Sequence, residues 1–545
     1  MADPNPGAYL AARQANVAND FGSSAHYYTK SLLSDPTNAA LLEKAMTSFM
    51  ALGQLDRAIP VAQAMVEKGY QSQMANLALS AKAAKDGDWS DIFTALEQGR
   101  GVAPLVDGLS QAWAHLGEGD MKKALNSFDQ LIETEGMAVY GMTHKAYALG
   151  LVGDFEGAEA VYLEAAAKGQ LRYSANSAMA HAQILSQLDR NDDAVAVLDS
   201  VFGTQRGPKV EAMYQALRAG RNLPFDTVSS ATEGLADIFF SVANAVKGEA
   251  PDNYTLLYTQ AASYLDPDNS NSVILTAELL DNMKQFDLAN EAYASVSRDD
   301  PAFHAAELGR AQVLFAAGRK DAAIEVLDAL TRSHPDVPQV YATKGDTLRR
   351  AGRYADATPA YSRALELYDS SSPVTWFVHY TRGITYHKTD NWTAAEADFR
   401  AALDMRPDQP QVLNYLGYSL VERGEKLDEA LDMIEKAAAA QPENGAIIDS
   451  LGWVLFQLGR YEEAVGYMES AAALLPVDPV INDHLGDVYW AVGRETEAQF
   501  QWQRALSFDP VEADADRIRD KLSRGLDLVL RDEGLDPIRM ASGND

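Results

Sequence analysis

One arrangement of small and apolar residues returns along the chain at intervals of about 34 residues. In its clearest copies a leucine–glycine pair is followed by a second glycine, an alanine and a proline. These copies are Leu416-Gly417, Gly424, Ala430 and Pro442; Leu451-Gly452, Gly459, Ala464 and Pro476; and Leu485-Gly486, Gly493, Ala498 and Pro510. Fainter copies extend the frame toward the N-terminus. A chain with such a period builds its fold from stacked copies of one unit.

The spacing inside each copy indicates a pair of helices. Apolar residues three and four positions apart form one face of a helix, as at Leu451 and Leu455. The small residues let two helices approach closely, the second glycine ends the first helix, and the proline follows the second helix. A single pair cannot bury its apolar face alone, so we expect neighbouring pairs to stack.

The pattern resembles the tetratricopeptide repeat (TPR), a pair of antiparallel helices of about 34 residues. The resemblance implies an all-α fold, a right-handed superhelical solenoid of about 14 helix pairs with a C-terminal capping helix. In sequence order we expect a block of about six pairs, an irregular junction, a block of about eight pairs, a capping helix and a tail, at residues 1–203, 204–235, 236–511, 512–531 and 532–545. The charge-rich sequence of the capping helix is expected to face solvent.

The composition excludes several classes of function. The 78 acidic residues outnumber the 46 basic ones, for a formal net charge of −32, and a surface of that sign repels phosphate backbones and anionic membranes. The absence of cysteine excludes disulfides, thiolate metal sites and thiol catalysis. No run of residues approaches the roughly 18 apolar positions of a membrane-spanning helix. We therefore expect no nucleic-acid partner and no direct membrane span.

No group of residues in the sequence has the spacing of a catalytic, metal or cofactor site. There is no glycine-rich phosphate loop, no His-Glu-x-x-His and no Gly-x-Ser-x-Gly. The stretch 265–270 is similar to the start of a calcium-binding loop, but Asn271 and Ala277 stand where that loop needs glycine and glutamate. We expect no enzyme activity, no cofactor and no metal.

The concave face of such a stack is lined by the first helix of each pair. Eight residues of the last three copies are expected there, because they occupy positions that the core does not use: Asn414, Tyr418, Asp449, Trp453, Phe456, Asp483, Asp487 and Trp490. Aromatic rings beside carboxylates suit a protein or peptide partner, because rings supply contact area and carboxylates bind basic or main-chain groups. We expect a neutral or basic extended segment in this groove. The alternative is that Trp453 and Trp490 pack against the adjoining pair.

Two stretches in the last copies are more specific than the general repeat: Pro442-Glu443-Asn444-Gly445-Ala446-Ile447-Ile448-Asp449-Ser450-Leu451-Gly452-Trp453, and further on His484-Leu485-Gly486-Asp487-Val488-Tyr489-Trp490. They resemble the final repeats of proteobacterial cell-envelope TPR proteins, which include lipoprotein adaptors of a carboxy-terminal processing protease. This resemblance implies a non-catalytic scaffold or adaptor, with a periplasmic protease and its substrates as partners. It also implies a periplasmic or cell-envelope location after removal of a signal peptide, with the cytoplasm as the alternative.

Two other functions remain open at this point. The chain could be an assembly factor or structural subunit of a large envelope complex, or the regulatory TPR arm of an enzyme such as a glycosyltransferase. Both would use the same solenoid surface, so the sequence does not separate them from an adaptor.

Overall fold

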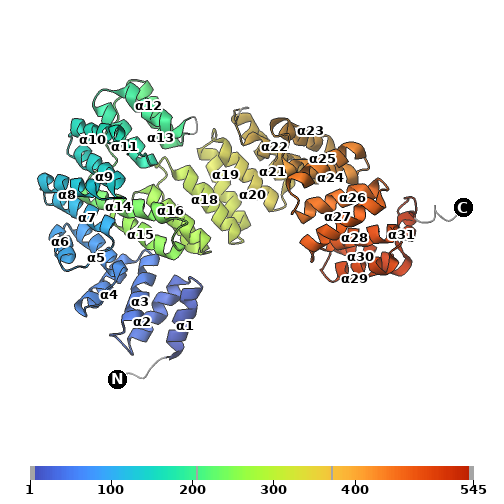
Figure 1. Ribbon diagram of the computed structural model, residues 1–545, viewed down its shortest axis with the longest axis horizontal. Coiled ribbons are helices and arrows are strands. Elements are labelled where there is room, and N and C mark those ends of the chain that lie inside the picture. Colours follow the sequence, from blue (N-terminus) through green and yellow to red (C-terminus); the bar gives the residue numbers. More distant parts are fainter. Residues whose placement is uncertain (1–5, 204–205, 370–371, 539–545) are drawn as a thin grey trace. The chain divides into compact units, whose positions relative to one another are not determined.

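The computed structural model describes residues 6–203, 206–369 and 372–538, and the regular structure of these residues is helical. One isolated bridge between Lys247 and Ala250 is the nearest feature to a strand among them. The all-α prediction is therefore confirmed. The chain forms two compact units, Met1–His334 and Pro335–Asp545, here called the N-terminal unit and the C-terminal unit (Figure 1).

The N-terminal unit contains 19 of the described helices. They are α1 (Pro6–Val17), α2 (Phe21–Leu32), α3 (Ala39–Ala51), α4 (Leu55–Glu67), α5 (Gln73–Asp86), α6 (Trp89–Glu97), α7 (Pro104–Gly117), α8 (Met121–Glu133), α9 (Ala138–Leu151), α10 (Phe155–Ala167), α11 (Ala175–Gln187), α12 (Asn191–Phe202), α13 (Pro208–Arg218), α14 (Ala231–Val246), α15 (Asp252–Leu265), α16 (Ser270–Asn282), α17 (Phe286–Ala294), α18 (Phe303–Ala316) and α19 (Lys320–Ser333). Six consecutive pairs precede the lone α13, and three pairs follow it.

The C-terminal unit continues the same arrangement. Its described helices are α20 (Pro338–Arg350), α21 (Tyr354–Leu367), α22 (Thr375–Lys388), α23 (Trp392–Met405), α24 (Pro410–Glu422), α25 (Leu427–Ala440), α26 (Gly445–Gln457), α27 (Tyr461–Leu474), α28 (Pro479–Ala491), α29 (Glu495–Leu506), α30 (Glu512–Arg524) and α31 (Leu526–Asp532). Helices α20 to α29 form five pairs, each packed on the next.

The glycines and alanines of the repeat make the close helix contacts that their spacing predicts. A Cβ at Gly383 would lie 2.7 Å from the ring of Phe399, and a Cβ at Gly417 would lie 2.7 Å from Ile434. On the second helices, Ala464 and its counterparts in the other copies are 0% exposed. Because any larger side chain at these positions would separate the two helices, the small residues fix how each pair packs.

The structure adds two boundaries to the expected ones. The chain divides into its compact units between His334 and Pro335, and the irregular junction expected at 204–235 contains the lone helix α13. The capping segment forms two helices, because Gly525 has a φ of 84° and ends α30. Residues 539–545 of the expected tail and 204–205 of the expected junction lie outside the described residues.

The hairpin α14–α15 explains why the N-terminal unit includes helices on both sides of α13. Helix α14 contacts α5, α7 and α9, and α15 contacts α3, α4 and α5, so the hairpin lies along the first helices of the preceding pairs (Figure 1). Its residues Leu235, Ile238 and Phe239 are 0% exposed. Gly234 lies against the indole of Trp113, which is also fully buried and leaves no room for a Cβ. The groove of these N-terminal pairs is therefore filled by the chain itself.

Polar contacts along the edges of the hairpin fix its position. Thr232 Oγ1 donates to the carbonyl oxygen of Ala84 (3.0 Å), and Gln260 Nε2 donates to that of Ala51 (3.1 Å). Lys85 Nζ donates to the carbonyl oxygen of Tyr264 (2.9 Å). These bonds tie α14 and α15 to α3 and α5.

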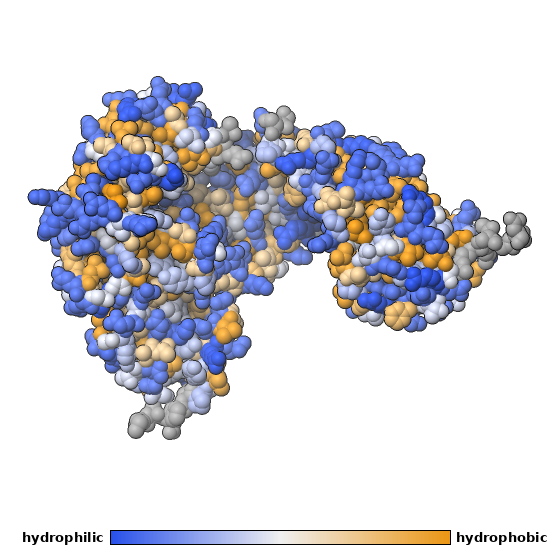
Figure 2. Space-filling model, viewed as in Figure 1, coloured by the Kyte–Doolittle hydropathy of each residue, from blue (hydrophilic) through white to orange (hydrophobic). Residues whose placement is uncertain are grey.

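Surface hydropathy follows the acidic composition. The faces visible in Figure 2 carry mostly hydrophilic residues, with smaller hydrophobic areas between them. Within the described residues, no helix has the length and apolar character that crossing a membrane would require.

Candidate functional site

The clearest hollow of the C-terminal unit lies where the sequence places the groove. The first helices α24, α26 and α28 contact one another in succession. Over them and α30 lies a hollow of about 650 Å³, here called the C-terminal hollow, whose lining includes Tyr418, Glu422, Trp453, Asp483 and His484. Three predicted site residues, Tyr418, Trp453 and Asp483, are thereby brought together.

Stacked rings form the floor of the C-terminal hollow. The ring of Trp453 stacks on His484 at a centroid distance of 3.9 Å and on Phe456 at 4.8 Å. Its Nε1 donates to Glu422 (3.0 Å). Trp453 is 8% exposed, so it packs against the adjoining pair and also lines the hollow. The two placements considered for this tryptophan, in the groove and against the adjoining pair, therefore each describe part of its environment.

His484 is a titratable group in this floor. Its Nδ1 lies 3.0 Å from Asp449 Oδ1. Burial alone lowers the pKa of His484, but the carboxylate of Asp449 outweighs burial and the pKa is raised. With a proton on Nδ1 the ring donates to Asp449, so Asp449 supports the floor from behind.

Three carboxylates line the C-terminal hollow, and two of them, Glu422 and Asp514, give it an acidic character. Glu422 accepts hydrogen bonds from Trp453 and from the hydroxyl of Tyr418, and Asp514 extends from α30. Neither carboxylate forms an ion pair with another described residue, whereas the two arginines in the lining, Arg423 and Arg517, pair with Glu425 and Glu533. A basic or hydrogen-bond-donating group would therefore be favoured in this hollow.

The rim of the hollow is apolar. Pro479, Val480, Pro510 and Leu535 line it, and Val480 and Leu535 are 43% and 56% exposed. Exposed apolar groups beside an aromatic floor offer contact area to apolar side chains of a partner.

The cap engages the remaining predicted residues of α28. Lys521, 1% exposed, donates to Asp483 (2.8 Å) and Asp487 (2.7 Å). Trp490 Nε1 donates to Asp527 of α31 (3.0 Å). The expectation that the charged sequence of the cap faces solvent is therefore wrong at Lys521, because the two carboxylates of α28 compensate its buried charge.

The other predicted residues lie behind the surface or outside the hollow. Asp487 is 1% exposed and accepts from Trp502 (2.8 Å), and Phe456 lies beneath Trp453. Asn414 is absent from the lining. His484 and the residues of α30 are not among the predicted site residues, although the position of His484 beside Asp483 in the repeat was a usable signal.

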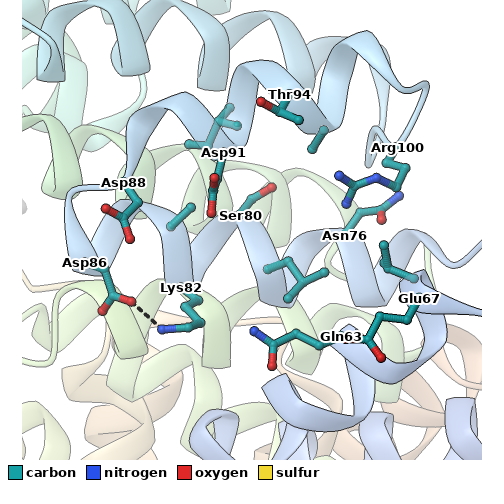
Figure 3. Close-up of a pocket in the computed structure, with 15 residues that line it drawn as sticks. Gln63, Glu67, Asn76, Ser80, Lys82, Asp86, Asp88, Asp91, Thr94 and Arg100 are labelled. Atoms are coloured by element: carbon teal, nitrogen blue, oxygen red, sulfur yellow. Dashed lines mark hydrogen bonds and ion pairs between the residues drawn. The ribbon is translucent and has the colours of Figure 1, made fainter.

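A second hollow of about 410 Å³ lies on α4, α5 and α6 of the N-terminal unit. Figure 3 shows Asp86, Asp88 and Asp91 toward one end and Arg100 toward the other, with Lys82 paired to Asp86. The groups have mixed charge and include no nucleophile held by a base. Among the described residues, no group of histidines and carboxylates is arranged to hold a metal ion.

Comparison with known proteins identifies the repeat. Models of the tetratricopeptide repeat match residues 282–346, 342–410, 380–445 and 416–479. The chain is 31% identical over 183 residues to TPR repeat-containing protein PA4667 of Pseudomonas aeruginosa, covering 33% of this chain and 30% of that protein. It is 24% identical over 177 residues to human tetratricopeptide repeat protein 13, covering 32% of this chain and 20% of that protein.

The matched part thus spans less than a third of each of these relatives. Among solved structures, a chain of the APC/C hetero-tetramer Cut9–Hcn1 aligns over 95% of both chains at 14% identity, with a TM-score of 0.40. The repeat models and relatives agree with the helix pairs described above. Residues 282–479 of the chain therefore carry tetratricopeptide repeats.

Proposed function

We propose that the chain is a non-catalytic protein-interaction scaffold that binds an extended partner segment in the C-terminal hollow. The observation that carries this proposal is the meeting of an aromatic floor, Tyr418 and Trp453, with the carboxylates of Glu422 and Asp514. Aromatic groups anchored by packing and hydrogen bonds lose little conformational entropy when a partner binds. The carboxylates select a segment with basic or neutral groups, and the apolar rim accepts its apolar side chains.

A binding role also fits the chemistry of the hollow better than catalysis. Its histidine, His484, is 8% exposed, stacks on Trp453 and is bonded to Asp449. The imidazole therefore supports the floor and does not face a reacting atom. Catalysis, where it is needed, belongs to the partner.

The proposed setting is the bacterial cell envelope, with a periplasmic protease and its substrates as the partners. The likeness of the last two repeats to those of envelope adaptors supports this setting. Fractionation of source cells with an antibody to the chain tests the location, and recovery in the cytoplasmic fraction alone would contradict it.

Affinity capture from crosslinked source cells tests the binding role. The variant Glu422→Gln with Asp514→Asn removes both charges from the hollow, and both residues are exposed. Glu435→Gln with Glu443→Gln is the matched control, because these exposed carboxylates lie outside the hollow. We expect the first variant to lose partners that the wild type and the control retain. Equal recovery by all three proteins would refute the proposed site.

A further inference from the structure

The hairpin α14–α15 leaves one opening in the groove of the N-terminal unit. A pocket of about 450 Å³ lies between α9, α11, α14 and α16, here called the N-terminal pocket. The hairpin packs on α5 and α7, so it closes the groove on that side. We therefore expect a ligand to enter this pocket end-on, because the hairpin occupies the path that an extended strand would take through the groove.

The chemistry of the N-terminal pocket is opposite to that of the C-terminal hollow. Its lining contains no aspartate or glutamate, although the chain has 78 acidic residues. Arg172, the one arginine in the lining, donates to the carbonyl oxygens of Leu171 (2.8 Å) and Gly169 (3.3 Å). It forms no ion pair with another described residue. The remaining lining is neutral.

Amide side chains from three helices converge on this pocket. Asn176 comes from α11, Asn244 from α14 and Asn271 from α16. Asn244 and Asn271 are exposed, and neither side chain is hydrogen-bonded to another described residue. A carboxamide carries the same donor and acceptor as a peptide group, so it can pair with a main-chain unit through two hydrogen bonds.

Two buried polar networks hold the walls in place. Asn176 and Ser241 donate to the buried Asp237, which lies 3.9 Å from His144 Nε2. On the other wall, Tyr173 OH lies 2.6 Å from His181 Nδ1, and His181 Nε2 lies 2.6 Å from Glu159. Groups fixed in advance lose little entropy on binding, which favours recognition.

We propose that the N-terminal pocket is a second binding site, for the uncharged main chain of a peptide that enters end-on. Asn244 and Asn271 hold its peptide groups, and the half-buried rings of Tyr140, Tyr173 and Phe240 contact its carbons. This inference extends the proposed scaffold function, because it gives each unit its own ligand of distinct chemistry.

Selection of phage-displayed random seven-residue peptides on the immobilised full chain tests the proposal. A linear library presents free chain ends and a disulfide-closed library presents loop tips. Comparing the two shows which of them supplies the bound main chain. Selected peptides are then measured on Asn244→Ala with Asn271→Ala, and on Asn282→Ala as the control. Asn282 is an exposed residue of α16 outside the pocket.

We expect selected peptides with few charged residues to lose about tenfold in affinity on the double variant and none on the control. The Glu422→Gln with Asp514→Asn variant should bind them normally. Recovery only of peptides that depend on Glu422 and Asp514 would overturn the second site and leave the first intact. Recovery only of peptides that depend on Asn244 and Asn271 would uphold the second site and count against the first. Recovery of no peptide dependent on Asn244 and Asn271 would likewise overturn the second site.

Discussion

The indole of Trp453 and the imidazole of His484 stack with ring centroids 3.9 Å apart and planes 11° apart. Asp449 raises the pKa of the imidazole despite its burial, and the protonated ring would place a cation on the face of an indole. The contact also joins α26 to α28. The floor of the C-terminal hollow is thus coupled to the charge of one buried histidine.

We expect the C-terminal unit to lose stability as pH rises. The folded-state pKa of His484 lies above its ordinary value of 6.5, so its contribution is fully present below pH 6.5 and is lost as pH rises through the folded-state pKa. Urea unfolding followed by tryptophan fluorescence, from about pH 6 to about pH 9, measures this change. His484→Gln should flatten the profile. Identical profiles for both proteins would show that His484 does not titrate as described.

Lys521→Met should destabilise the C-terminal unit by about 3–5 kcal/mol. The substitution removes the buried cation that Asp483 and Asp487 share and leaves them only the more distant guanidinium of Arg517, at 4.0 Å and 3.6 Å. Lys436→Met is the matched control, since Lys436 pairs with Asp432 on the exposed surface of α25, and it should have little effect. Urea unfolding of the two variants gives the comparison. A loss no larger than that of the control would mean that the buried ion pairs contribute no net stability.

Two glycine-to-alanine substitutions should have opposite effects. At Gly486 a Cβ would meet the indole of Trp502, whereas at Gly466 it would meet nothing within 4 Å. We expect Gly486→Ala to destabilise by about 1–3 kcal/mol and Gly466→Ala, within α27, to stabilise by about 0.5–1 kcal/mol. Thermal unfolding measures both, and stabilisation by Gly486→Ala would contradict the close packing of α28 on α29.

Asp237→Asn should stabilise the packing of α14 at neutral pH. Burial raises the pKa of Asp237 to about 6 from 3.8, so the folded state holds its proton more tightly than the unfolded state. The stability linked to that proton is present below pH 3.8 and is lost as pH rises through about 6. Hydrogen exchange of α14 should therefore be slower in the variant than in the wild type at pH 8, and similar at pH 4.

Glu249→Gln, at an exposed position after α14, is the control for Asp237→Asn and should exchange like the wild type. Faster exchange of α14 in Asp237→Asn at both pH values would show that the carboxylate itself stabilises the contact.

The sequence predicts those parts of the structure that depend on contacts within one repeat. The positions of Gly417 and Ala464 in the repeat predict where two helices contact each other, because the neighbours of these residues lie in the same or the adjoining copy. The position of α14–α15 depends on contacts such as Gly234 with Trp113 and Gln260 with Ala51. These partners are far apart in the chain, and no periodic pattern links them.

The candidate site shows the same division. Tyr418, Trp453 and Asp483 follow from repeat register, and the structure brings them into one hollow. The engagement of Asp487 by Lys521 and of Trp490 by Asp527 does not follow from register, because α30 and α31 lie outside the repeat. Charge spacing alone does not distinguish a buried lysine from a solvated one.

The buried hairpin also determines where this protein can be divided. A fragment ending at residue 203 would lack α14 and α15, and with them the contact of Gly234 on Trp113, which is 0% exposed in the intact unit. We expect such a fragment to aggregate on expression. A fragment ending at His334 keeps the hairpin in place, so recombinant work on the first half should use that boundary.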